Sequence, residues 1–297
     1  MIETRTAKVK RNISTSVMLQ ILKIFLNFAG RIIFVRILGA SYLGVNGLFS
    51  NVLTILSVAD FGMTTAMMYS LYKPLASGDK EKVTIYVNTF KKIYSVIAIV
   101  VAILGVLIVP LLKYIVNLPE NMEGIYVFYF LMLANTGVGY FCIYRTILLQ
   151  ADQKSYLLDI VDIIAQILLF ILQICVLVTT KNFALYLGLN VVMTLISNVA
   201  KSKIVSKQYK HLTIPVRKLN KVERSTLIRN VKDSFLYRIG GIIQSNTDNI
   251  LTSIFVGTIA VGYYSNYTMI ILAVTSFISI IFTALKASGG SVNSDAS

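Results

Sequence analysis

Charged residues are scarce in this sequence. Asp, Glu, Lys and Arg together make up 14% of its 297 residues, whereas an average soluble domain contains about 25%. Hydrophobic residues make up 56%, and the mean hydropathy is +0.74. Such a composition excludes a soluble enzyme and an intrinsically disordered chain.

Cysteine and histidine are nearly absent as well. The two cysteines, Cys142 and Cys175, both lie within apolar runs, which predicts small buried side chains and excludes a secreted module stapled by disulfides. His211 is the single histidine, so the sequence holds no histidine-rich metal site. It also lacks the phosphate-binding loop GxxxxGK(S/T) and any recognisable Ser/His/Asp set. We therefore predict a protein that is not an enzyme and that needs no cofactor or resident metal.

Long apolar runs are what the sequence has instead. A membrane-spanning helix needs roughly 20 mostly apolar residues, and the short alternating segments of an outer-membrane barrel do not occur. The predicted fold class is an all-α integral membrane protein with about eight transmembrane helices. The expected spans are residues 13–36, 43–70, 93–116, 124–149, 156–179, 183–205, 234–257 and 262–285.

Basic residues lie between these spans and predict their orientation. The net charge is +15, from 28 Lys and Arg against 13 Asp and Glu. With a cytoplasmic N-terminus, 22 basic residues fall in cytoplasmic segments and 3 in external ones, as the positive-inside rule requires. The most basic stretch, residues 201–232, is expected to be a juxtamembrane loop. Its expected partner is anionic membrane lipid, at about 1 kcal/mol per basic residue, and not nucleic acid.

A pair of glycines five residues apart occurs twice, at Gly39 and Gly44 and again at Gly257 and Gly262. The offset of 218 residues spans six helices, which would keep both copies in one orientation, as in parallel transporter repeats. Two ordinary hairpin turns would also give this pattern. We interpret the chain as a truncated two-lobe protein. Its predicted parts are an N-terminal six-helix lobe (1–205), a basic cytoplasmic linker (206–233), the first two helices of an incomplete second lobe (234–285) and a polar tail (286–297).

One polar stripe runs along the first expected span. Gln20, Lys23, Asn27 and Arg31 fall within about 80° of its circumference at 100° per residue. A basic residue at the bilayer centre costs roughly 2.5–3.5 kcal/mol, so it should face protein or water. The stripe predicts the wall of an aqueous cavity that binds an anion. Snorkelling of Lys23, or packing pairs, would be the structural alternative.

The second and fifth expected spans contain carboxylates that fit more than one role. Asp60 could neutralise Arg31 or Lys23, or bind a coupling cation, and a purely structural pair is the alternative. Asp159 and Asp162 lie near a cytoplasmic helix start, where a hydrated environment is expected.

The seventh expected span is the richest in polar residues. Arg238, Ser245, Asp248 and Asn249 share one broad face. Asp248 lies about midway along the span, where a lone carboxylate needs a cation or an arginine partner. We predict that this face looks across the cavity toward the first lobe.

Two blocks of the sequence resemble a known family. "IIFVRILGASYLGVNGLFSNVLTILSVADFGMTTAMMYSLYKPLASGDKEK" resembles the first two helices of Wzx-type polysaccharide repeat-unit flippases, and "NTDNILTSIFVGTIAVGYYSNYTMI" is similar to their seventh and eighth helices. The resemblance covers most of residues 5–285. It implies membership of the multidrug/oligosaccharidyl-lipid/polysaccharide (MOP) exporter superfamily, whose members typically have 12–14 helices in two lobes. It also implies a bacterial cytoplasmic membrane.

The resemblance implies a function and assigns roles to the polar residues. Relatives transfer an undecaprenyl-pyrophosphate-linked oligosaccharide of capsule or O-antigen from the inner to the outer leaflet, and polysaccharide polymerases and other assembly proteins are expected partners. Alternating access would use a coupling cation, Na⁺ or H⁺, at Asp60 or Asp248. The expected substrate-binding residues are Lys23, Asn27, Arg31, Arg238, Ser245 and Asn249.

Two other functions would fit an all-α membrane chain. A multidrug exporter of the same superfamily should favour acidic and aromatic cavity walls for cationic drugs, whereas the expected cavity is basic. A membrane enzyme of glycan assembly usually carries a sizeable external loop, and the external loops expected here are short.

Overall fold

The computed structural model describes residues 5–57, 61–116, 122–213, 217 and 219–275. Within these residues the chain forms α-helices and short 3₁₀ turns, with no β-strand. In chain order the helices are α1 (Arg5–Leu38), α2 (Ala40–Leu56), α3 (Phe61–Ala76), α4 (Lys80–Ile108), η2 (Val109–Leu111), α5 (Leu112–Ile115), α6 (Ile125–Tyr140), α7 (Ile143–Ala151), α8 (Tyr156–Thr180), α9 (Phe183–Gln208), η3 (Lys210–Thr213) and α10 (Lys221–Phe255). A last helix begins at residue 258 and is described as far as residue 275.

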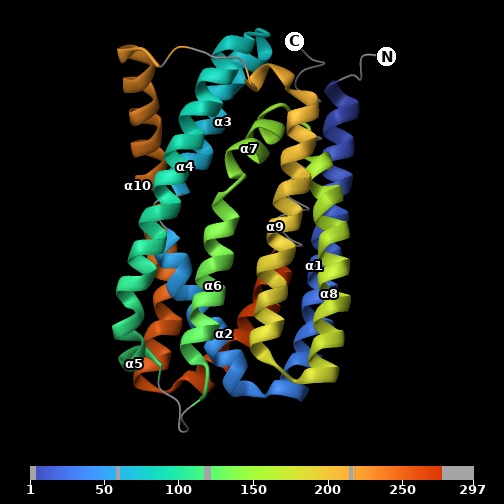
Figure 1. Cartoon of the computed structure of the whole chain (residues 1–297), viewed down its shortest axis with the longest axis vertical. Helices are drawn as coiled ribbons and strands as arrows, with labels where there is room; N and C mark the ends of the chain where they lie inside the picture. Colours follow the sequence, from blue (N-terminus) through green and yellow to red (C-terminus); the bar gives the residue numbers. More distant parts are fainter. Residues whose placement is uncertain (1–4, 58–60, 117–121, 214–216, 218, 276–297) are drawn as a thin grey trace.

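The long helices run side by side along the longest axis of the molecule (Figure 1). Helix α8 packs between α1 and α9, and α6 packs against α9 and α4. Helix α10 lies far along the sequence but packs against α3 and α2. The turns between α1 and α2 and between α8 and α9 lie at the lower end in Figure 1, which we call the glycine end because it contains Gly39 and Gly257.

Several helices are suited to a lipid environment, and the protein is an all-α membrane protein. Among the described residues, three helical segments are long and apolar enough to cross a membrane, namely Lys80–Ile115, α8 and α9, with mean hydropathies of 3.1, 2.6 and 1.7. The bent pair α6 and α7 counts as a fourth if it is one span. Few apolar side chains of α8 are buried inside the protein, so this helix presents its apolar surface to lipid.

The expected span over residues 124–149 is broken. Helix α6 ends at Tyr140, α7 begins at Ile143, and the two are bent by 45°. Gly137 and Gly139 precede the break and weaken the helix there. After the break, Arg145 donates hydrogen bonds to Ser202 and Ser206 of α9, the latter at 2.8 Å. These hydrogen bonds hold α7 against α9 at an angle to α6. Apolar periodicity alone does not predict this bend.

The basic stretch 201–232 is largely helical, where the sequence suggested a loop. Helix α9 continues to Gln208, and α10 begins at Lys221, well before the expected span at residue 234. A capping box fixes this start: Glu223 N donates to Asn220 Oδ1, and Asn220 N donates to Glu223 Oε2, both at 2.8 Å. Reciprocal bonds of this kind satisfy the exposed N–H groups of a first helical turn.

The two glycine motifs meet at the glycine end. Gly39 and Gly257 adopt φ of 89° and 127°, a region that glycine enters freely, and each directly precedes a helix. Gly44 and Gly262 then bring these two helices into backbone contact. A Cβ atom on Gly44 would lie 2.1 Å from the carbonyl oxygen of Thr258, and one on Gly262 would lie 2.7 Å from that of Ala40. Small residues at a crossing allow this close approach.

Two apolar clusters fill the bundle, one toward each end. The cluster nearer the glycine end contains Phe34, Phe128 and Phe183, with ring centroids of Phe128 and Phe183 4.8 Å apart. The other contains Phe90, Tyr94 and the core of α7. The cavities adjoin the cluster nearer the glycine end, because its members Phe34, Leu43 and Leu187 also line them.

Candidate functional site

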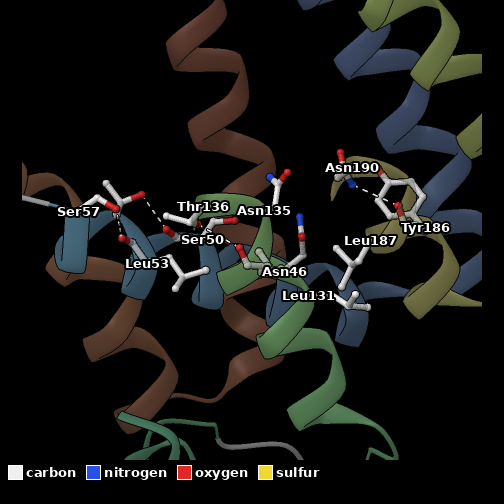
Figure 2. A pocket seen from close by; sticks show the side chains of 12 residues that line it. Asn46, Ser50, Leu53, Ser57, Leu131, Asn135, Thr136, Tyr186, Leu187 and Asn190 are labelled. Atoms are coloured by element: carbon white, nitrogen blue, oxygen red, sulfur yellow. Dashed lines mark hydrogen bonds between the residues drawn. The ribbon is translucent and has the colours of Figure 1, made fainter. Parts of the chain in front are cut away.

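A cavity of about 520 Å³ lies among α1, α2, α8, α10 and the last helix. A second cavity, of about 460 Å³, lies among α2, α6 and α9. The two adjoin, because Asn46, Ser50 and Tyr186 line both. Figure 2 shows polar side chains of α2 and α6 facing the second cavity, with Tyr186 and Asn190 of α9 alongside. Volumes of this size suit a small-molecule head group.

Side-chain amides dominate the polar lining. They come from α1, α2, α6, α8, α9 and α10, and lie among hydroxyl groups of Ser50, Thr136 and Tyr186. The amides are those of Gln20, Asn27, Asn46, Asn51, Asn135, Gln166, Gln173, Asn190 and Asn249. Amides both donate and accept hydrogen bonds, so they suit a ligand rich in hydroxyl groups.

Arg31 is the only charged side chain among the described lining residues. Its Nε donates to Asn266 Oδ1 at 2.5 Å, and its Nη2 donates to Ser265 Oγ. Both acceptors are neutral and belong to the last helix. Within the described part of the chain, no carboxylate forms an ion pair with Arg31. The guanidinium therefore keeps a net positive charge in a polar cavity, which is a suitable site for a phosphate.

Two lining amides have oxygens without a partner. Oδ1 of Asn135 and Oδ1 of Asn249 are buried and accept no hydrogen bond within the described structure. A buried acceptor without a donor costs about 1–3 kcal/mol. Hydroxyl donors of a ligand, or water, would relieve this cost.

The structure places only part of the polar stripe of the first expected span on the cavity. Gln20, Asn27 and Arg31 line it, while Lys23, one turn before Asn27, is half-buried and does not. The role predicted for Lys23 in substrate binding stays a prediction, and so do those of Asn27 and Arg31.

The residues predicted on the second and seventh spans are only partly visible. Asn249 is buried and lines the cavity, whereas its neighbour Asp248 is exposed and does not. Helix α10 includes Arg238 and Ser245, but the described structure does not extend to their side chains. Asp60 lies outside the described residues.

Asp159 and Asp162 fasten helices together at the end opposite the glycine end. Asp159 Oδ2 accepts from Ser16 Oγ of α1 at 2.6 Å, and Asp162 Oδ1 lies 2.5 Å from Nζ of Lys201 on α9. These side chains are structural contacts within the bundle.

Several lining residues were not singled out from the sequence. They are Asn135, Thr136, Tyr186, Asn190 and Ser265. Asn135 and Asn190 each interrupt a strongly apolar helix, and this signal could have identified them. The contact of Asn266 with Arg31 spans 235 residues of sequence, so no local pattern indicates it.

The profile of one protein family, described as "Polysaccharide biosynthesis protein", matches residues 9–285. The chain belongs to this family. No curated protein matches the sequence. The family match covers both cavities and both glycine motifs, so the amide-lined site lies wholly within the family's part of the chain.

Comparison with solved structures shows the fold of this chain. One similar structure is the "inward-facing conformation of a multidrug resistance MATE family transporter of the MOP superfamily", with a TM-score of 0.60 and 16% identity over 85% of this chain and 59% of that one. Another, designated "protein A", has a TM-score of 0.72 and 10% identity over 92% of this chain and 62% of that one. The chain thus has a MATE-type fold and spans about three fifths of the length of these two structures.

Proposed function

We propose that this chain acts as a flippase for a lipid-linked oligosaccharide. The substrate would be an undecaprenyl-pyrophosphate-linked repeat unit of capsule or O-antigen type, moved from the inner to the outer leaflet of a bacterial cytoplasmic membrane whose cytoplasmic side holds the N-terminus. Family membership supports a role in polysaccharide biosynthesis, and the MATE-type fold supports transport.

The observation that carries the proposal is the composition of the cavity wall. One arginine lies among amides, and no Asp or Glu is present in the described lining. A pyrophosphate needs a positive charge and N–H donors, and a sugar needs groups that exchange hydrogen bonds with hydroxyls. Arg31 would bind the phosphate, while Asn27 and Asn249 would bind sugar hydroxyls or phosphate oxygens.

Lys23, Arg238 and Ser245 complete the proposed substrate-binding set, on the basis of their place in the sequence. The coupling cation, Na⁺ or H⁺, is proposed to bind at Asp60 or Asp248. The lipid chain would stay in the bilayer while the head group crosses. Anionic lipids at residues 201–232 and other assembly proteins are the proposed partners.

A multidrug exporter is the second candidate, because one structural relative carries that description. Its cavity would need carboxylates for cationic drugs, and the described lining has none. Drug-resistance profiling of cells that express the full coding sequence separates the two, since a flippase should change surface polysaccharide and leave drug tolerance unaltered.

The test compares two arginines on one helix. In a strain that lacks its own copy, the full coding sequence should restore surface polysaccharide, and Arg31→Gln should reduce it strongly. Arg36→Gln is the matched control, because Arg36 is exposed on α1 and does not line the cavity. Normal polysaccharide output from Arg31→Gln cells would refute the assignment.

A further inference from the structure

Arg31 also joins two distant parts of the chain. It lies on α1, and its hydrogen-bond partners Ser265 and Asn266 lie 234 and 235 residues later, on the last helix. Ser265 Oγ in turn donates to the carbonyl oxygen of Gly262 at 2.8 Å. The guanidinium is therefore bonded to the same turn that contains the glycine contact with α2.

This turn closes the glycine end of the bundle. Gly262 touches Gly44, and a Cβ atom on Gly47 would lie 3.6 Å from Val261 Cγ1 and 3.9 Å from Ser265 Cβ. Val261 is fully buried. Separation of α2 from the last helix would expose Val261 and break the backbone contact at Gly44.

The two bonds occupy an edge of the guanidinium that a phosphate can use. Nε and Nη2 point the same way and form a fork that matches two oxygens of a phosphate. A phosphate adds the attraction between opposite charges to these bonds, which the neutral oxygens of Ser265 and Asn266 do not supply. An anion at this edge would therefore displace Ser265 and Asn266, which are neutral.

We propose that Arg31 is a latch whose bonds to Ser265 and Asn266 keep the glycine end closed, and that a phosphate-bearing ligand releases it by taking the same N–H groups. This inference rests on the proposed function, because it assumes that the phosphate enters the cavity at Arg31. It adds the coupling between binding and opening. The ligand can favour opening because it binds better to an arginine that has left the last helix.

The opening can be measured by cysteine labelling of the purified chain in detergent. The two native cysteines are replaced by alanine, and Val261→Cys serves as the reporter of the buried contact. We expect slow reaction with a maleimide in the unliganded protein. Ser265→Ala combined with Asn266→Ala should label at least about tenfold faster, because losing even one of the two hydrogen bonds to the charged guanidinium shifts an equilibrium by about this factor. We call this double variant the latch-free variant. Inorganic pyrophosphate should accelerate labelling of the protein that retains Ser265 and Asn266, and it should not change the labelling rate of the latch-free variant.

Two further variants guard against a general loss of structure. Asn266→Asp should slow labelling and raise the pyrophosphate concentration required, since a carboxylate would hold Arg31 more strongly than an amide. Thr275→Ala is the matched control on the same helix, because its hydroxyl donates only to Ile271 O, at 2.8 Å, and does not line either cavity. It should label at the original rate.

Binding of radiolabelled pyrophosphate is measured on the same samples, so that the two proposals can fail separately. If pyrophosphate binds through Arg31 but labelling does not change, the latch is overturned and the proposed function stands. If the latch-free variant labels no faster than the original, the latch is overturned irrespective of binding. If pyrophosphate does not bind at all, ligand-driven release is overturned together with the anion site of the proposed function.

Discussion

Gly44→Ala should force apart the two helices that meet at the glycine end. The added Cβ atom would lie 2.1 Å from the carbonyl oxygen of Thr258, whereas ordinary contact begins at 3.4 Å. The last helix would have to retreat by about 1.3 Å, the difference between these distances. The obstacle is backbone, so no side-chain rotation relieves it.

The expected cost is at the upper end of that for an overpacked core, about 1–3 kcal/mol. Thermal unfolding of the purified chain in detergent, followed with a thiol-reactive dye, should show a fall of several degrees. Gly188→Ala is the matched control, because Gly188 is also helical and a Cβ atom there meets nothing within 4 Å. An equal melting temperature for Gly44→Ala and Gly188→Ala would refute the backbone contact.

Two more predictions concern the opposite end of the bundle. Asp162→Asn should destabilise the chain by about 1–3 kcal/mol, a value between those for exposed and fully buried ion pairs, because the side chains of Asp162 and Lys201 are 29% and 13% exposed and Lys201 Nζ lies 2.5 Å from Asp162 Oδ1. In a thermal melt, adding Lys201→Met to this variant should restore part of the lost stability. A further loss of stability would contradict the pairing. Arg217 and the backbone N–H of Asn220 lower the pKa of Glu223 from 4.5 to about 2, so this carboxylate stabilises the start of α10 fully above pH 4.5 and progressively less as the pH falls toward 2. Hydrogen exchange at residues 219–224, corrected for the intrinsic pH dependence, should rise over that range in the original chain and stay flat in Glu223→Gln; an equal rise in both would contradict the lowered pKa.

The sequence predicted the fold class because apolar runs and basic flanks follow from the bilayer itself. It predicted the wrong form for residues 124–149, since the break after Tyr140 depends on Arg145 reaching Ser202 and Ser206 of another helix. Residues 201–232 were expected to form a loop because they are rich in basic residues. In the structure, α9 extends into this stretch to Gln208, and the capping box at Asn220 starts α10 within it.

In the candidate site, too, the sequence predicted which residues share a helix face but not which distant residues they contact. Helical periodicity placed Arg31 and Asn27 on one face, and both line the cavity. It could not separate Lys23 from that face, because periodicity gives a residue's direction on the helix and not which neighbouring helices enclose it. The partners of Arg31 lie over 230 residues away, and no local pattern announces a contact of that separation. Asn135 and Asn190 belong to helices whose orientation only the packing of α6 against α9 decides.

The most direct test of the account is binding of undecaprenyl pyrophosphate to the purified chain, compared between Arg31→Gln and Arg36→Gln. Loss of a charge-assisted contact should weaken binding at least about tenfold in Arg31→Gln, while Arg36→Gln should bind as the original does. Equal affinity in the two variants would show that the pyrophosphate does not bind at Arg31, and it would contradict the cavity described here as the substrate site.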